Sequence, residues 1–350
     1  MATIKSIRFP KYTKPSGFVL IDVPKPAITN QNEILIKVHA ASINPVDVKL
    51  AAGFLRIIGS PEFPAALGYD VSGVVEAIGD DVKDFKIGDA VYSRVPQAYL
   101  GTFQEYVVTN EETTSLKPSN ISFEEAAAVP LVTLTALQAL ERAPESIKGK
   151  TVYVNGGLSG TGSAAIQLAK NVFGASKVIS TVSTVKVDQL PKVLGEGLVD
   201  EIIDYKKQYP PKVLPDRSID FVFDTVAEAF PLLHAVKEGG YIATIALPPS
   251  GDAIASAMGL KLNWLLQKII NGVFNVYNYR ASRWGVNYGS IILESRKGEL
   301  RRITQWIEEG KFKPVVGKIV PIDDFEQVKN AFSQVYDAKG LTGKTVIKFA

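Results

Sequence analysis

The feature that most constrains the fold of this sequence is a strand, a glycine-rich turn and a helix joined without interruption at residues 150–170. The segment reads KTVYVNGGLSGTGSAAIQLAK. Its TVYV part has the β-branched and aromatic content of a buried strand, and its last part has the Ala, Ile, Leu and Gln content of a helix. In such a segment, the first N–H groups of the helix and the positive end of its dipole both face the space beside the turn, where an anion can bind. The segment therefore predicts a turn that binds phosphate.

The turn itself extends from Gly157 to Gly162. Without a β-carbon, Gly157 can form a tight turn and Gly162 lets the helix pack closely against the strand. The residues predicted to hold the phosphates are Gly157, Ser159, Gly160, Thr161 and Gly162. Ser159 replaces the middle glycine of the GxGxxG pattern, so a glycine-rich loop that only connects two elements is the alternative.

Size and composition indicate a globular chain of about two domains. The chain has 350 residues, 46% of them hydrophobic, and a net charge of +3. No run of like charge exceeds two residues, which disfavours a nucleic-acid partner and a polybasic membrane anchor. The sequence has no cysteine and only two histidines, which excludes disulfides and cysteine-ligated or histidine-rich metal sites. No stretch approaches the ~18 apolar residues of a transmembrane segment.

The pattern of predicted strands and helices changes near residue 125. Residues 1–125 contain short strands separated by Gly and Pro, a pattern typical of a compact, partly closed β-domain. Ser122 and Glu125 then form a capping box at the start of a helix. Strands and helices alternate beyond it, which predicts an α/β fold with a doubly wound parallel sheet. Helices are expected at 163–173, 187–195 and 227–237, and two late strands, near 315–322 and 345–349, are expected to join the N-terminal domain.

Six ordered motifs resemble the medium-chain dehydrogenase/reductase superfamily, in its zinc-free quinone oxidoreductase branch. One is the glycine turn, and the others are ASINPVDVKLAAG (41–53), LGYDVSGVVEAIGDDVKDFKIGDAVY (67–92), GTFQEYVV (101–108), AAAVPLVTLTALQAL (126–140) and FVFDTV (221–226). The resemblance implies a GroES-like catalytic domain at 1–126 and 283–350 and a Rossmann nucleotide-binding domain at 127–282. It also implies a homodimer, and we expect a cytoplasmic protein.

The resemblance also bears on metal content. It places Asn44, Tyr69 and Leu131 at the positions where zinc alcohol dehydrogenases of the superfamily hold their catalytic metal. None of the three is a plausible zinc ligand. Without a Lewis acid, the expected reaction is reduction of an electron-poor acceptor, a quinone or an α,β-unsaturated carbonyl, by hydride from a nicotinamide cofactor. The expected substrate is a small hydrophobic electrophile such as a quinone, an enone or an enal.

The end of the second parallel strand favours NADPH over NADH. An NAD enzyme places an Asp or Glu there, whereas this chain has Val182, Ser183 and Thr184. The residues that would suit a 2′-phosphate are Ser183, Thr184, Lys186 and Tyr205. The lysine of the family usually stands at the position of Val187, one residue later than Lys186.

Further cofactor contacts are implied by the resemblance. They are Thr135, near the carboxamide, and the strand-end residues Thr225, Ile245, Ala246 and Leu247. Ligands of open parallel sheets bind at this edge. The alternative is that Asp224 and Thr225 only complete a strand.

Asn44 and Tyr69 are the candidate catalytic residues. The Asn44 amide, also counted as a cofactor contact, can donate a hydrogen bond to a developing oxyanion without titrating. Asp47 is expected to anchor the Asn-Pro-Val-Asp turn. Tyr69 can donate a hydrogen bond or a proton, or it can be a packed core tyrosine.

Two questions stay open in the sequence. The apolar segment Leu260–Tyr279 is expected to pack in the core or a dimer interface, and the alternatives are a pocket wall or a membrane-touching surface. The alternative functions are a zinc-free carbonyl or alcohol oxidoreductase and a non-catalytic, crystallin-like NADPH-binding protein.

Overall fold

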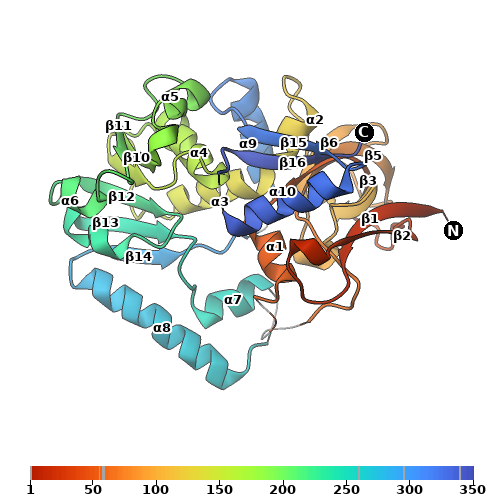
Figure 1. Ribbon diagram of the computed structural model, residues 1–350, viewed down its shortest axis with the longest axis horizontal. Helices are drawn as coiled ribbons and strands as arrows, with labels where there is room; N and C mark the ends of the chain where they lie inside the picture. The colour runs from red at the N-terminus through yellow and green to blue at the C-terminus, as the bar shows by residue number, and fades with distance from the viewer. Residues whose placement is uncertain (1, 55, 57–59, 259–260, 295, 339) are drawn as a thin grey trace. The chain divides into compact units, whose positions relative to one another are not determined.

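The computed structural model describes residues 2–54, 56, 60–258, 261–294, 296–338 and 340–350, which form two compact units (Figure 1). Unit 1 consists of Met1–Leu131, Ser295–Gly310 and Pro314–Ala350. Unit 2 consists of Val132–Glu294 and Lys311–Lys313. The sequence places the first boundary at 126/127 and the second at 282/283. Residues 283–294 belong to unit 2 because they contain a strand of its sheet.

Unit 2 is built on a six-stranded sheet whose neighbouring strands are all parallel, in the order β11-β10-β9-β12-β13-β14. The strands are β9 (Thr151–Val154), β10 (Lys177–Val182), β11 (Glu201–Asp204), β12 (Ile219–Asp224), β13 (Val236–Thr244) and β14 (Asn287–Ser290). From β9 the chain continues to β10 on one side and later to β12 on the other. Open parallel sheets bind ligands at such a switch point, beyond the carboxyl ends of the strands. The predicted doubly wound parallel sheet is confirmed.

Helix α3 (Pro130–Glu141) precedes β9, and further helices connect the strands. They are α4 (Gly160–Gln167), the π-helix η4 (Leu168–Val172), α5 (Gln189–Leu194), α6 (Pro210–Val213), α7 (Gly251–Met258) and α8 (Trp264–Ser282). The helix expected at 163–173 begins three residues earlier, at Gly160, because Ser159 caps it. Most of the apolar segment Leu260–Tyr279 forms α8, and its first residue, Leu260, lies outside the described residues.

The helix expected at 227–237 is wrong. The chain forms only a short 3₁₀ helix, η6 (Phe230–Ala235), and then enters β13 directly. Pro231 lacks the N–H group that a continuing helix would need. Val236 already pairs with Ile219 in the sheet, so pairing with β12 overrides the apolar helical pattern of this segment.

Unit 1 contains two β-sheets. One has the order β15-β16-β3-β5-β6-β8, with β7 also paired to β3, and the other has the order β2-β1-β4. The strands are β1 (Thr3–Phe9), β2 (Val19–Pro24), β3 (Glu33–Ile43), β4 (Ala65–Ala66), β5 (Asp70–Ile78), β6 (Ala90–Arg94), β7 (Tyr106–Asn110), β8 (Thr114–Leu116), β15 (Val316–Pro321) and β16 (Lys344–Lys348). The two late strands join the N-terminal sheet as predicted, since β16 lies between β15 and β3.

The helices of unit 1 include α1 (Pro45–Ala51), α2 (Phe123–Ala127), α9 (Glu299–Glu308) and α10 (Phe325–Asp337). Side chains of α1 and α10 belong to one of its hydrophobic cores, and α2 begins where the sequence pattern changes, near residue 125. The predicted capping box at Ser122 is confirmed, because its Oγ accepts from Glu125 N at 3.1 Å. Phe332 of α10 packs edge-on against Phe103 and Phe18, and joins sheet and helix in one core.

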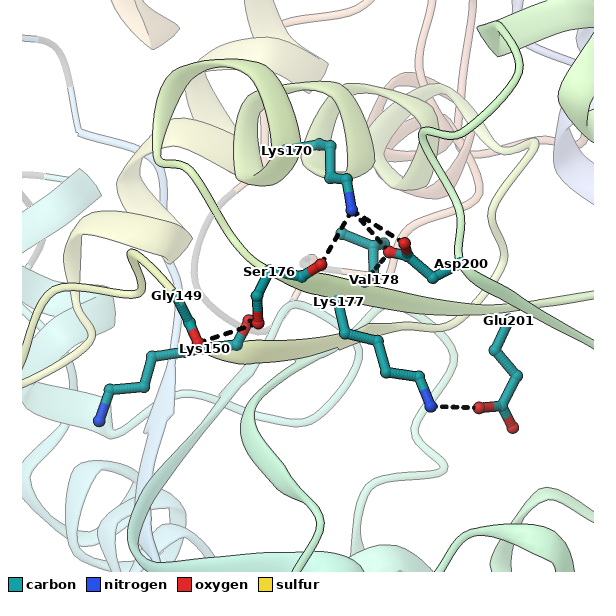
Figure 2. A network of polar contacts seen from close by, with 8 residues as sticks. All are labelled: Gly149, Lys150, Lys170, Ser176, Lys177, Val178, Asp200 and Glu201. Atoms are coloured by element: carbon teal, nitrogen blue, oxygen red, sulfur yellow. Dashed lines mark hydrogen bonds and ion pairs between the residues drawn. The ribbon is translucent and has the colours of Figure 1, made fainter.

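The amino ends of the unit 2 strands are joined by a polar network (Figure 2). Lys170 Nζ donates to both carboxylate oxygens of Asp200, at 2.7 and 3.0 Å. The same carboxylate accepts from Val178 N at 2.7 Å. Lys177 Nζ lies 2.6 Å from Glu201 Oε2. At this edge of the sheet, these charged groups are therefore paired within the protein.

Candidate functional site

The glycine turn between β9 and α4 requires glycine at positions 157 and 162. Gly156, directly before the turn, has a φ of 68°, in the left-handed region. A β-carbon on Gly157 would lie 2.3 Å from Ser180 Oγ of β10, and one on Gly162 would lie 2.2 Å from the carbonyl oxygen of Gly156. Both distances are far inside van der Waals contact. The two glycines thus bring strand and helix into the close approach that a phosphate-binding turn requires.

Ser159, which replaces the middle glycine of the pattern, is the N-cap of α4. Its Oγ accepts from Gly162 N at 3.0 Å, and its carbonyl oxygen accepts from Ser163 N at 2.9 Å. Gly160 and Thr161 form the first turn of the helix, where backbone N–H groups have no acceptor within the helix. The serine therefore strengthens the helix start, and the residues predicted to hold the phosphates share one turn.

The four residues predicted to suit a 2′-phosphate follow two adjacent strands. Ser183, Thr184 and Lys186 follow β10, and Tyr205 follows β11 with its backbone N donating to Val182 O at 3.1 Å. Ser183 and Lys186 are half-buried, whereas Thr184 and Tyr205 are exposed. Burial lowers the pKa of Lys186.

Two carboxylates lie near these four residues in the sequence. Asp204 ends β11, but its Oδ1 accepts from Lys206 N at 3.0 Å within its own turn. Asp188, the first acidic residue after β10, stands at the N-cap position of α5. Neither occupies the end of β10, where an NAD enzyme carries its acid.

The ends of β9, β12 and β13 share a buried network around Asp224. Its carboxylate accepts from Asn155 Nδ2 at 2.8 Å and from Thr244 Oγ1 at 3.0 Å. Thr225 belongs to the same network, since its N and Oγ1 donate to Asn155 Oδ1 at 2.6 and 2.9 Å. Asn155 was not among the predicted residues, although a polar residue directly after the strand TVYV was a usable signal.

The remaining predicted cofactor contacts of unit 2 lie on two elements. Ile245, Ala246 and Leu247 continue β13, and the N–H groups of Ala246 and Leu247 donate to Thr244 Oγ1 at 3.1 and 3.3 Å. Thr135 lies on α3 and is 7% exposed. We use the name carboxyl edge for the glycine turn together with the residues that follow β10, β11, β12 and β13.

Unit 1 contains a second polar group of residues, fully enclosed by the protein. Asn44 has no exposed surface, its Nδ2 donates to Asp70 Oδ2 at 2.8 Å, and its Oδ1 accepts from Lys344 Nζ. Asp70 also accepts from Ser42 Oγ at 3.0 Å, and Lys344 Nζ lies 3.5 Å from Asp70 Oδ2. These four residues, Ser42, Asn44, Asp70 and Lys344, form what we call the buried cluster. Burial lowers the pKa of Lys344, and the negative charge of Asp70 acts against this.

Sequence reasoning missed the role of Lys344 and Asp70. Lys344 begins β16 and stands 300 positions from Asn44, so local pattern could not join them. The available signal was a lone lysine at the start of the apolar strand that ends in TVIKF.

Two further predicted residues flank the buried cluster. Asp47 Oδ2 accepts from Asn44 N at 2.7 Å and so anchors the start of α1, as expected. Burial raises the pKa of Asp47. Tyr69 is 4% exposed, its hydroxyl donates to Gln97 Oε1, and the Arg94 guanidinium lies 5.1 Å from its ring centre. Burial raises the pKa of Tyr69, so its hydroxyl stays protonated at neutral pH.

Comparison with known sequences and structures gives consistent matches. The alcohol dehydrogenase GroES-like domain matches residues 30–119, and the zinc-binding dehydrogenase domain matches residues 199–347. The chain is 36% identical to the 2-methylene-furan-3-one reductase of Solanum lycopersicum, over 91% of this chain and 72% of that protein. It is also 36% identical to the chloroplastic NADPH-dependent alkenal/one oxidoreductase of Arabidopsis thaliana, with the same two coverages. The quinone oxidoreductase structure from Coxiella burnetii superposes with a TM-score of 0.79 at 28% identity, over 100% of both chains.

One of the matched domains is described as zinc-binding, but the side chains at the expected ligand positions do not fit zinc. The Asn44 amide is bonded to a carboxylate and to an ammonium group, Tyr69 donates to Gln97, and Leu131 has no donor atom in its side chain. Zinc in proteins takes thiolate, imidazole or carboxylate ligands. Within the described ranges, no group of three or more His, Cys, Asp or Glu residues could hold a metal ion.

Proposed function

Because this chain belongs to the medium-chain dehydrogenase/reductase superfamily, in its quinone oxidoreductase-like branch, we propose that it is an NADPH-dependent, zinc-independent reductase. It transfers hydride to quinones or to the C=C bond of α,β-unsaturated carbonyls. The named activities of the relatives, on a methylene-furanone, on alkenals and alkenones, and on quinones, support this class of acceptor. The observation that carries the proposal is the carboxyl edge, where a closed glycine turn adjoins a strand end without an acid.

The carboxyl edge suits the phosphates of NADPH in two places. The pyrophosphate would bind at Gly157, Ser159, Gly160, Thr161 and Gly162, where the first turn of α4 begins. The 2′-phosphate would bind at Ser183, Thr184, Lys186 and Tyr205, which offer hydroxyl groups and one cation. Thr135, Thr225, Ile245, Ala246 and Leu247 are proposed to line the nicotinamide end.

NADPH, when bound, supplies the hydride for the reduction. The residues of the chain then need to hold the acceptor and stabilise the charge that develops on its oxygen. The Tyr69 hydroxyl carries its proton at neutral pH and donates a hydrogen bond to Gln97, and we propose that it donates a hydrogen bond or the proton to the acceptor in place of this contact. The Asn44 amide has no exposed surface and bonds Asp70 and Lys344, so we propose for Asn44 a positioning role through these two residues.

An acceptor screen tests the function. Oxidation of NADPH and of NADH is followed with quinones, enals, enones and saturated aldehydes, and reduction of NADP⁺ and NAD⁺ is followed with alcohols. We expect turnover of quinones or of enals and enones, with NADPH preferred. Preference for saturated carbonyls or alcohols would replace the proposal by a zinc-free carbonyl reductase. NADPH binding without turnover of any acceptor would replace it by a non-catalytic binding protein.

Cofactor choice is tested at Lys186. Removing one charge-assisted hydrogen bond to a phosphate costs about 1.5–3 kcal/mol, so Lys186→Ala should raise the Kd of NADPH by roughly tenfold or more and leave that of NADH unchanged. Lys192→Ala, on the exposed side of α5 in the same unit, is the matched control. Equal loss of NADPH and NADH affinity in Lys186→Ala would contradict the assignment.

The catalytic proposal is tested at Tyr69. Tyr69→Phe removes only the hydroxyl, and loss of a general acid lowers kcat by about 100-fold or more. An unchanged kcat would return Tyr69 to a packing role. Asn44→Ala is less clean, because it also removes a partner of Asp70 and of Lys344.

A homodimer and a cytoplasmic location are proposed from the resemblance alone. Light scattering coupled to gel filtration measures the first, and imaging of a tagged chain measures the second. One relative is named chloroplastic, so an organelle is the alternative location.

A further inference from the structure

One face of α8 carries an apolar stripe that unit 2 does not cover. Its side chains are between 41% and 66% exposed. They are Trp264, Leu265, Ile269, Val273, Val276 and Tyr279. From Leu265 to Tyr279 they are spaced three or four residues apart, which places them along a single side of the helix. A stripe of this size on an otherwise globular protein marks a surface that binds something.

The opposite face of α8 fixes the helix to unit 2, so the stripe points away from the core. Phe274 and Tyr277 contact Tyr288 of β14, with ring centres 5.6 and 6.2 Å apart. Ala281 is fully buried. Asn271 Nδ2 donates to Asp252 of α7 at 2.9 Å. Figure 1 shows α8 as a long helix beside β14.

The charges of the α8 segment itself are of one sign. No Asp or Glu occurs between Asp252 and Glu294. The charged residues of this interval are Lys261, Lys268, Arg280 and Arg283. The nearby carboxylate of Asp252, on α7, accepts hydrogen bonds from Gln267 and Asn271 of the helix. A helix with an apolar face and only cations in its own segment has the composition of an interfacial helix that binds anionic lipid.

A basic hollow adjoins the carboxyl end of the stripe. It has a volume of about 440 Å³, and its lining includes Arg280, Arg283, His234, Phe230, Tyr279 and Trp284. The Arg280 guanidinium lies 4.8 Å from the centre of the Phe230 ring. Acids also lie nearby, Asp216, which is 3.9 Å from His234 and exposed, and Glu238, which lies against Gly285. Two guanidinium groups in an aromatic hollow can bind the phosphate group of a lipid. The acyl chains of that lipid would then contact the apolar stripe.

We propose that α8 binds the surface of an anionic lipid bilayer, lying in its plane, with lipid headgroups in the hollow at Arg280 and Arg283. The helix has 19 residues and is about 28 Å long. No helix in the described part of the chain is long and apolar enough to cross a membrane, which agrees with a helix that lies on the surface. Tryptophans near the two ends, Trp264 and Trp284, suit the boundary between headgroups and acyl chains.

Charge decides against a second copy of the chain as the occupant. Two copies of α8 packed on each other would bring their cations together, and no acid on the helix could pair with them. An anionic bilayer instead attracts each of these cations and removes the apolar side chains from water. This proposal does not depend on the proposed reductase activity.

Vesicle sedimentation with the full chain tests the proposal. The probes are vesicles of phosphatidylcholine alone and vesicles with about one part in four phosphatidylserine. We expect binding to the anionic vesicles, reduced by salt. Ile269→Glu/Val276→Glu should lower the partition coefficient by about tenfold or more, and Arg280→Gln/Arg283→Gln by about 30-fold. Thermal unfolding of each variant verifies that it is folded.

Two control variants carry matched changes elsewhere in unit 2. Val213→Glu places a charge on an apolar side chain of similar exposure, 40%. Lys192→Gln/Lys212→Gln removes two exposed cations. Both should bind vesicles like the unmodified chain. A second readout uses Trp306→Phe, which leaves Trp264 and Trp284 as the only tryptophans. Their fluorescence should shift to the blue and be quenched by lipids brominated in the acyl chain.

Three results would overturn the proposal. The first is equal binding to neutral and anionic vesicles, or none to either. The second is a dimer in solution that Ile269→Glu/Val276→Glu converts to monomers, without vesicle binding by the unmodified chain, since the stripe would then bind a second copy. The third is a stripe variant that binds vesicles normally while inorganic phosphate competes, since the hollow would then be a site for small anions.

Discussion

Asp70 in unit 1 and Asp224 in unit 2 are both fully buried, and the two carboxylates are stabilised in different ways. Asp70, in unit 1, accepts hydrogen bonds from neutral groups and also lies 3.5 Å from the ammonium group of Lys344. Asp224, in unit 2, accepts from Asn155, Thr244 and two backbone N–H groups, at 2.8 to 3.3 Å. Among the residues that the structure describes, no cation bonds to Asp224. One carboxylate is therefore compensated by a charge and the other by dipoles alone.

The difference teaches how each region responds to change. In a buried ion pair, each charge is stabilised mainly by its one partner. Removing that partner leaves an uncompensated charge in a medium of low dielectric constant. A carboxylate surrounded by neutral donors spreads its stabilisation over several bonds of about 1 kcal/mol each. We expect the buried cluster to be sensitive at single positions and the carboxyl edge to tolerate the loss of one donor.

Lys344→Met should have the largest effect. It removes the cation from Asp70, and the free energy of unfolding should fall by about 3–5 kcal/mol. Urea unfolding of the purified chain measures the loss. Lys25→Met is the control, because the pair of Lys25 with Glu76 is partly exposed and its loss should cost less than about 1 kcal/mol.

A double variant sharpens this prediction. In Asp70→Asn/Lys344→Met neither charge remains, so the loss should be smaller than the sum of the two single losses by at least about 1 kcal/mol. Additive losses would show that the two charges are not coupled, and the comparison between the units would then fail.

Glu33 should show the next largest effect, through pH. It is a buried carboxylate that, like Asp224, is held by neutral donors, from Thr29 N at 2.7 Å and Asn30 N at 3.0 Å. Burial acts to raise the pKa of Glu33, but these hydrogen bonds lower it from 4.5 to about 2. Its contribution to stability is therefore complete above pH 4.5 and is lost as the pH falls toward 2.

Glu33→Gln should lower the free energy of unfolding by about 2 kcal/mol at pH 7. The difference from the unmodified chain should shrink as the pH falls from 4.5 toward 2, and unfolding curves across this range measure it. A difference that stays constant down to pH 2 would mean that neutral donors do not hold this carboxylate ionised.

Thr244→Val removes one of the donors of Asp224 and keeps the shape of the side chain. The loss should be only about 1–2 kcal/mol, because the other donors of Asp224 remain, while the N–H groups of Ala246 and Leu247 lose an acceptor. Urea unfolding under the conditions used for Lys344→Met gives the direct comparison. A loss as large as that of Lys344→Met would show that Asp224 depends on a single partner after all.

The smallest effect is expected at the network in Figure 2. The side chains of Lys170 and Asp200 are 21% and 34% exposed, so Lys170→Met should cost about 0.5 kcal/mol, less in high salt. Lys150→Met, whose partner Glu145 is 80% exposed, should cost still less. A loss above 2 kcal/mol for Lys170→Met would place this surface network in the same class as the buried cluster.

The sequence was sufficient where structure depends on neighbours in the chain. The capping box at Ser122 and the turn at Gly157 were predictable because helix starts and tight turns depend on residues within a few positions. The parallel sheet followed from alternating strands and helices. The return of β16 to the N-terminal sheet followed from two late strands that had no other partner.

The sequence was insufficient where distant residues meet. No residue near Asn44 in the sequence indicated that Lys344 would donate a hydrogen bond to its amide oxygen. This contact determines how the Asn44 side chain can take part in the proposed reaction. The apolar pattern at 227–237 was read as a helix because the pairing of Val236 with Ile219 is not visible locally. For α8, the sequence indicated only an apolar segment, and the structure showed that it forms a helix whose two sides differ in exposure.

The place of β16 in the sheet also orders events during synthesis of the chain. β16 fills the position between β3 and β15, and Lys344 neutralises Asp70, so unit 1 cannot complete its core until residue 348 has left the ribosome. Nearly all of unit 2 lies between residues 132 and 294 and is available earlier. Unit 2 can therefore fold first, while the N-terminal strands of unit 1 keep one carboxylate uncompensated until β16 is translated.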